Sequence, residues 1–233
     1  MKKLLLTVAS ILLLATTGNV ASASELKSGN EQKLNYKNWV DEQIDSATGD
    51  EKTELLNSYK QYKEISNEDQ EKFVEYIYNP QEQEQALRAF ATVPENSSRS
   101  LQNGDIEVTS TFIEEELPGK AKGTAVPVKK TYKRALSIKG IKILESTIWV
   151  QHMQKDGEIT GTPIADAFTS VNLYPTLSDT YSSPAISNTK LVVVASSVVT
   201  FTTKIDNIKY AQTGTIAIYS DVNGYSDGTY TTE

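Results

Sequence analysis

Apolar residues recur at helical spacing in the first part of the chain and at alternating positions in the rest. Between residues 34 and 92 they return every three or four positions, which predicts four amphipathic helices. The expected buried faces carry Tyr36, Val40 and Ile44, then Leu55, Leu56, Tyr59 and Tyr62, then Phe73, Val74 and Ile77, and finally Ala86, Leu87 and Phe90.

Capping residues predict where two of these helices begin and end. Ser66 and Asp69 have the spacing of a capping box, which places the start of the third helix there. Pro80 disfavours a helical residue before it, so the third helix should end at Asn79. Asn79 can also cap the fourth helix, with Pro80 in its first turn.

After Gly104 the pattern changes to the two-residue period of β-strands. Strong signals for a turn lie at Gly140, at Asp156-Gly157 and at Asn223-Gly224. Residues 114–127 and 174–184 are polar and contain prolines, so we expect irregular loops there. Strands are expected at residues 106–112, 128–153 (on either side of Gly140), 158–168, 191–203, 210–220 and 225–232.

These elements predict an α+β protein in which a small N-terminal helical module precedes an antiparallel β-sandwich. The helical module should cover residues 24–91 and the sandwich residues 105–233. Residues 92–104 are rich in Ser, Asn and Pro, so they should form an exposed linker. A trypsin-like protease should then cut first at Arg99 within it.

The first 23 residues have the pattern of a secretory signal peptide. Lys2 and Lys3 precede a short apolar run, and Ala21-Ser22-Ala23 forms a small-residue cleavage site. The chain contains no cysteine, so disulfides and thiolate metal sites are excluded. We therefore expect a secreted, extracellular protein of a Gram-positive bacterium, without a transmembrane helix in the mature chain.

The charge is acidic overall and unevenly distributed. The formal charge of −7 becomes −9 without Lys2 and Lys3. Residues 24–94 hold 15 acidic and 8 basic side chains, whereas residues 95–233 hold 15 and 13. An acidic balance argues against a nucleic acid as the main partner. The number of subunits is not indicated by the sequence.

One basic stretch, residues 120–142, stands out against this acidic background. On an extended strand Lys129, Lys133 and Lys139 share one face, opposite Tyr132 and Leu136. That face could contact the bacterial envelope or an anionic wall polymer. It could instead pair with the acidic helical module, or it could simply be a solvated strand face.

No group of residues predicts catalysis or metal binding. His152 is the single histidine, and no nucleophile motif accompanies it. Glu114, Glu115 and Glu116 are neighbours on an expected loop, which is typical of a solvated charge run. Residues 221–228 resemble a calcium loop but depart from its spacing, and a hairpin turn explains them better. We therefore expect a non-enzymatic protein without a cofactor or metal site.

The strand at residues 191–201 leaves two interpretations open. Its sequence LVVVASSVVTF is long enough to cross a bilayer as a tilted strand, which requires ~10 residues. A strand buried in a sandwich core has the same composition.

Several short features resemble a known family. They are the strand pair ALSIKGIKILESTIWVQHMQKDG, the loop at Asn172-Leu173-Tyr174-Pro175 and the C-terminal turns Asn-Gly and Tyr-Ser-Asp-Gly. The segment SNEDQEKFVEYIYNPQ also looks like the acidic helix that precedes such domains. Together they resemble the geobacillin-type family of large secreted bacteriocin-like proteins of Gram-positive bacteria.

This resemblance implies an antibacterial protein that acts at the target cell envelope. It carries over no site residues. The alternative function is an extracellular module that binds the wall or another protein without killing.

Overall fold

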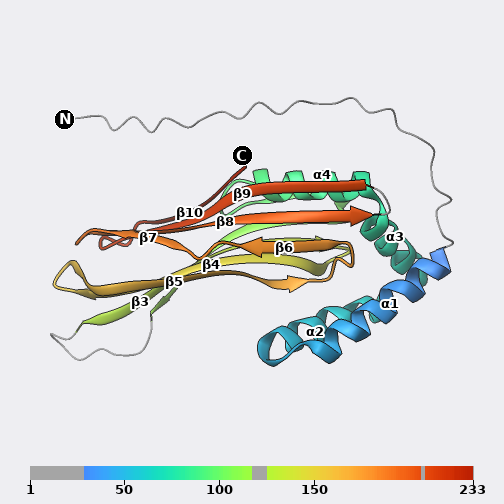
Figure 1. Cartoon of the computed structure of the whole chain (residues 1–233), viewed down its shortest axis with the longest axis horizontal. Helices are drawn as coiled ribbons and strands as arrows, with labels where there is room; N and C mark the ends of the chain where they lie inside the picture. Colours follow the sequence, from blue (N-terminus) through green and yellow to red (C-terminus); the bar gives the residue numbers. More distant parts are fainter. Residues whose placement is uncertain (1–28, 117–124, 206–207, 233) are drawn as a thin grey trace.

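Four helices precede two stacked antiparallel sheets, as Figure 1 shows for this computed structural model. The structure describes residues 29–116, 125–205 and 208–232. The predicted α+β class, with a helical module followed by a β-sandwich, is confirmed. The expected signal peptide lies outside the described residues.

The helices follow the apolar periodicity of the sequence. They are α1 (Gly29–Ser46), α2 (Gly49–Glu64), α3 (Asn67–Tyr78) and α4 (Pro80–Thr92). The Ser66 side chain accepts a hydrogen bond from the Asp69 backbone N–H at the start of α3. Asn79 caps α4 in the same way, with Pro80 in the first turn. Both caps are those that the sequence predicts.

The first sheet, sheet A, has the strand order β1-β2-β3-β4-β5. Between β3 and β4 lies a two-residue turn at Lys139-Gly140, where both residues have positive φ angles of 52° and 76°. Such a turn matches the twist of the flanking strands. The strands are β1 (Ser98–Leu101), β2 (Ile106–Glu116), β3 (Val126–Ile138), β4 (Ile141–Lys155) and β5 (Glu158–Asn172).

The second sheet, sheet B, has the order β10-β9-β8-β6, and β7 also pairs with β8. β6 and β7 are short, whereas β8 and β9 have 14 residues each. The strands are β6 (Leu177–Tyr181), β7 (Ala185–Asn188), β8 (Val192–Ile205), β9 (Ile208–Asp221) and β10 (Ser226–Thr232).

Three segments expected to be irregular contain strands. The expected linker contains β1, which pairs with β2, and the 3-10 turn η1 (Gln102–Gly104). Cleavage at Arg99 would therefore require β1 to leave the sheet edge. Glu114 to Glu116 belong to β2 rather than to a loop, and β6 lies within the expected loop at residues 174–184. In each case pairing with a neighbouring strand overrides a polar, weakly patterned sequence.

The helices and the sandwich share one continuous set of buried apolar side chains. Tyr36, Tyr62 and Phe73 pack edge to face among α1, α2 and α3. Phe90 of α4 is fully buried against Phe201 of β8 and Tyr230 of β10, with ring centroids 5.6 and 6.2 Å away. The last helix thus completes the core between the two sheets.

Candidate functional site

Two of the three predicted contact lysines, Lys129 and Lys133, lie on the outer face of sheet A, where carboxylates of the same chain surround them. Lys129 Nζ is 3.7 Å from a Glu115 oxygen and lies over the Trp149 ring. Lys133 Nζ is 3.2 Å from Glu145 Oε1. Trp149 is therefore on this outer face and not in the core, although the apolar residues on either side of it suggest burial.

Lys139 connects the sandwich to the helical module. Its Nζ is 3.0 Å from Asp69 of α3 and 2.6 Å from Asp105, which precedes β2. This hydrogen bonding lowers the pKa of both carboxyls below the usual range. The sequence left three alternatives open for the basic strand face. Lys139 follows one of them, because it pairs with a carboxylate of the acidic helical module. Contact of Lys129, Lys133 and Lys139 with an envelope stays a prediction.

His152 lies inside the sandwich, with its Nε2 3.2 Å from Ser220 Oγ of β9. Both residues are almost completely buried, and His152 Nδ1 has no hydrogen-bond partner among the described residues. Burial lowers the pKa of the imidazole. A hydrolytic dyad needs substrate access and a group that orients the histidine, and neither is present in the described part of the chain.

The resemblance of residues 221–228 to a calcium loop has a simpler structural explanation. Asp221 Oδ1 accepts hydrogen bonds from the backbone N–H groups of Asn223 and Tyr225. This arrangement stabilises the turn between β9 and β10. Over the described residues, no three His, Cys, Asp or Glu side chains are grouped so that they could hold a metal ion.

An arginine that sequence reasoning treated as part of the basic run lies in the protein interior. Arg134 Nη2 donates to the Val93 carbonyl at 2.9 Å, and Nη1 donates to the Phe90 carbonyl. Its Nε donates to the Tyr132 hydroxyl at 2.7 Å. The guanidinium thereby satisfies carbonyls at the C-terminal end of α4, where a cation is favoured by the helix dipole.

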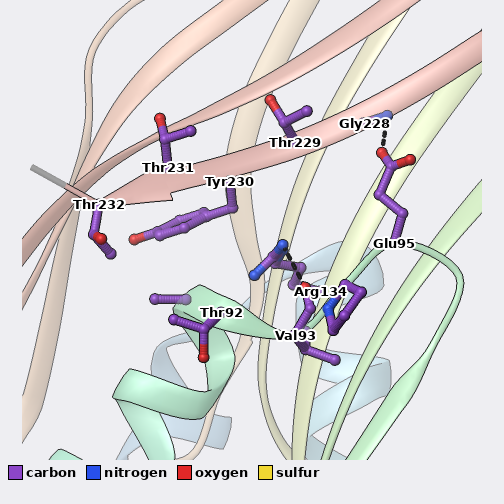
Figure 2. A pocket seen from close by; sticks show the side chains of 11 residues that line it. Thr92, Val93, Glu95, Arg134, Gly228, Thr229, Tyr230, Thr231 and Thr232 are labelled. Atoms are coloured by element: carbon purple, nitrogen blue, oxygen red, sulfur yellow. Dashed lines mark hydrogen bonds between the residues drawn. The ribbon is translucent and has the colours of Figure 1, made fainter.

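The same arginine approaches the C-terminal strand. Its guanidinium carbon is 5.1 Å from the centroid of the Tyr230 ring, and both residues line an open cavity of about 570 Å³ (Figure 2). Because three of its nitrogens already donate within the chain, Arg134 is a poor candidate for binding a ligand. Its contacts instead hold β3, α4 and β10 together.

Glu95 closes the other side of this cavity. The Gly228 backbone N–H donates to the Glu95 carboxylate, as Figure 2 shows. Burial, together with a hydrogen bond to Asp227, raises the pKa of Glu95 to about 7. Asp227 Oδ1 is buried and receives no hydrogen bond from any group in the described ranges. A protonated Glu95 carboxyl would supply that hydrogen bond.

Two glycines let β10 approach its neighbours closely. A Cβ atom at residue 228 would overlap the Tyr132 ring, and one at residue 214 would lie 2.6 Å from the Thr231 carbonyl oxygen. Together with Glu95, Arg134, Asp227 and Tyr230, Gly228 forms a set of contacts that we call the β10 clasp. It fixes the edge strand of sheet B to α4 and β3.

The clasp lies beside a long hairpin that has no charged residues along most of its length. Residues 192–203 of β8 and 210–220 of β9 contain no Asp, Glu, Lys or Arg. The face toward the core is mainly apolar, with Val193, Ala195, Val199, Phe201, Ile216 and Ile218. The opposite face mixes threonine with valine and alanine, and Thr200 and Thr213 pair on it with their Oγ1 atoms 3.0 Å apart.

The inward position of Arg134 could be predicted from the sequence, whereas the position of Glu95 beside Asp227 could not. Alternation places Arg134 on the same face as Tyr132 and Leu136, which indicates an inward orientation. Glu95 lies in a segment without periodicity, and its partner Asp227 is 132 positions away in sequence. Only the packing of β10 brings the two carboxyls together.

Within the described ranges, no helix has the length and apolar character needed to cross a membrane. Comparison of the chain with protein-family models, with curated proteins and with solved structures finds no match.

Proposed function

We propose that this chain is a secreted antibacterial protein that acts on the envelope of a target cell without catalysing a reaction. The family resemblance and the expected signal peptide motivate this function. The observation that carries it is the long β8–β9 hairpin, which has no charged residue over positions 192–203 and 210–220. Each strand has 14 residues, more than the ~10 needed for a tilted strand to cross a hydrocarbon layer.

In this mechanism the hairpin separates from its neighbours and enters the target bilayer. An unpaired charge at the centre of a bilayer costs several kcal/mol, so a segment without charges meets the first requirement for entry. The side that faces the core, with Val193, Val199 and Ile216, would contact lipid, while the opposite side, which mixes threonine with valine, would pair with other copies. Release of the hairpin requires separation from β6 and β7 at one edge and from β10 at the other.

An engineered disulfide tests whether the β8–β9 hairpin must separate from the rest of sheet B for the protein to act on a membrane. Thr180 of β6 lies directly opposite Thr200 of β8, and directly opposed residues of antiparallel strands are close enough for a disulfide. We expect the oxidised Thr180→Cys, Thr200→Cys variant to release dye from anionic lipid vesicles at least tenfold more slowly than wild type. Reduction with dithiothreitol should restore release, because the described chain has no cysteine of its own.

A matched control places the bond inside the hairpin. Thr200→Cys with Thr213→Cys joins β8 to β9, which would move together, so oxidation should leave dye release unchanged. Full release by the oxidised β6–β8 variant would contradict hairpin entry. Absence of growth inhibition by wild-type protein across a broad panel of Gram-positive bacteria would contradict the antibacterial function itself.

A second function, binding to the cell wall without killing, is favoured by a different observation. A polar cleft that contains Trp39 lies between the helical module and the sandwich. Retention of the protein on isolated walls, without growth inhibition or dye release, would support this second function over the first.

A further inference from the structure

We infer that the cleft between the helical module and sheet A binds a glycan chain of the bacterial wall. The cleft has a volume of about 370 Å³, within the range of small-molecule sites. Trp39 and Gln43 of α1 line one side. Asn172 at the end of β5, Pro175 in the connection that follows, and Asp179 of β6 line the other. This inference rests on the proposed function for the choice of a bacterial wall as the glycan's source.

Three polar groups in the cleft are available to a ligand. Among the described residues, neither the Trp39 indole N–H nor the Gln43 side-chain amide has a hydrogen-bond partner, and Asp179 Oδ2 accepts none. Trp39 and Gln43 are four positions apart on α1, so they lie on the same helix face. The cleft therefore offers two donors from one element and a carboxylate from another.

A second group of contacts holds the opposite wall of the cleft in place. Asn172 Nδ2 donates to Asp179 Oδ1 and to the Leu177 carbonyl, both at 3.1 Å. Asn172 Oδ1 accepts the Tyr174 backbone N–H at 3.1 Å. These bonds orient the Asp179 carboxylate and leave its other oxygen free. An oriented carboxylate needs little reorganisation when a ligand binds, which favours affinity.

This combination of groups matches the chemistry of a sugar. A pyranose ring has an apolar C–H face that packs on an aromatic ring, and hydroxyls at its edge that both donate and accept. Gln43 can donate and accept at once, and Asp179 accepts from hydroxyls. An anionic polymer would be repelled by Asp179, so the neutral glycan strand of the wall fits better than a phosphate-rich polymer.

The probe is the soluble β-1,4-linked tetramer of N-acetylglucosamine. The chain has two tryptophans, so in a Trp149→Phe background Trp39 is the remaining fluorophore, and its emission should change on titration. Gln43→Ala and Asp179→Asn should each weaken binding about tenfold, the effect of losing one good hydrogen bond. Asn can keep the contact with Asn172, so Asp179→Asn should preserve the fold.

Asn38→Ala is the matched control, because Asn38 is an exposed amide on α1 that does not line the cleft. It should bind the tetramer as wild type does. If the tetramer does not bind, or if Gln43→Ala and Asp179→Asn bind it normally, the cleft is not a glycan site.

Dye release measured on the same samples separates the two proposals. Release without tetramer binding would overturn the cleft inference and leave the proposed function standing. If the protein binds the tetramer but neither inhibits growth nor releases dye, the cleft inference stands and the proposed antibacterial function is overturned.

Discussion

Glu95 is the residue whose ionisation has the clearest consequence for the stability of the fold. Its raised pKa means that the folded protein binds a proton there which the unfolded chain releases above the ordinary value of ~4.3. The stabilising contribution is thus complete in acid and is lost as pH rises through about 7. Above that pH the Glu95 carboxylate is charged in its partly buried site beside β10, with Arg134 as the nearby cation.

Glu95→Gln should remove this dependence. The amide resembles the protonated acid and can still donate to Asp227, so the variant should match wild type near pH 5. Near pH 8 it should be more stable by about 1 kcal/mol, a value that allows for solvent screening of a partly buried group. Urea unfolding at both pH values measures the difference. Equal destabilisation of Glu95→Gln at both pH values would contradict a stabilising proton on Glu95.

The pKa of His152 is shifted in the opposite direction, so its effect on stability must be distinguished from that of Glu95. Burial lowers its pKa, so its contribution to stability is present above pH ~6.5 and is lost as pH falls through the lower folded pKa. Both wild type and Glu95→Gln keep His152. The difference between them at each pH therefore isolates the carboxyl pair.

At the scale of elements, β3 carries cations on both faces with different roles. Lys130 and Arg134 point inward and are buried, whereas Lys129 and Lys133 lie on the outer face. Lys139, in the turn after β3, holds Asp69 and Asp105. Removing a cation from the outer face and removing one from the turn should therefore change the free energy of unfolding by different amounts.

Lys139→Gln should lower the free energy of unfolding by about 1 kcal/mol, because two neighbouring carboxylates would then lack their cation. Lys129→Gln with Lys133→Gln should change it by less than about 0.5 kcal/mol, since Glu145 retains Lys142 and Ser170. If the outer face contacts an envelope, this double variant should bind anionic vesicles more weakly at low salt. Unchanged binding would contradict that role for Lys129 and Lys133.

The sequence predicts strongly patterned elements well and weakly patterned ones poorly. All four helices, the Asn79 cap and the Gly140 turn follow from local signals that tertiary contacts do not oppose. β1 and β6 were missed because their short polar sequences become strands only through pairing with β2 and β8. The clasp and the Trp39 cleft unite residues from distant segments, so no local pattern could reveal them.

At the scale of the whole molecule, the helical module and the sandwich depend on a shared core. Phe90 is completely buried where α4, β8 and β10 meet. Arg134 adds hydrogen bonds from β3 to the end of the same helix. The sequence pattern changes from helical to alternating near residue 92, but the buried core of the protein is continuous across that point.

Phe90→Ala should cost about 3–5 kcal/mol, the usual effect of deleting a large buried side chain. The loss should appear equally in both parts of the molecule. Trp39 reports on the helices and Trp149 on sheet A, so Trp149→Phe and Trp39→Phe backgrounds can follow each part separately in urea. Coincident midpoints are expected for one cooperative unit. Two separated midpoints would show that the parts fold independently.

The inward cations of β3 also affect how the two sheets could separate. Most sandwiches lose hydrophobic burial along the whole interface when water enters. Here Lys130, which pairs with Glu114, and Arg134, which donates to three oxygens of the chain, face the interior. Hydration of these cations offsets part of the cost when water reaches them. Wetting the gap between β3 and β10 is therefore less costly than wetting the aliphatic gap between β4 and β8. Opening should begin at the β10 side, so the closed sandwich has a built-in direction in which it comes apart.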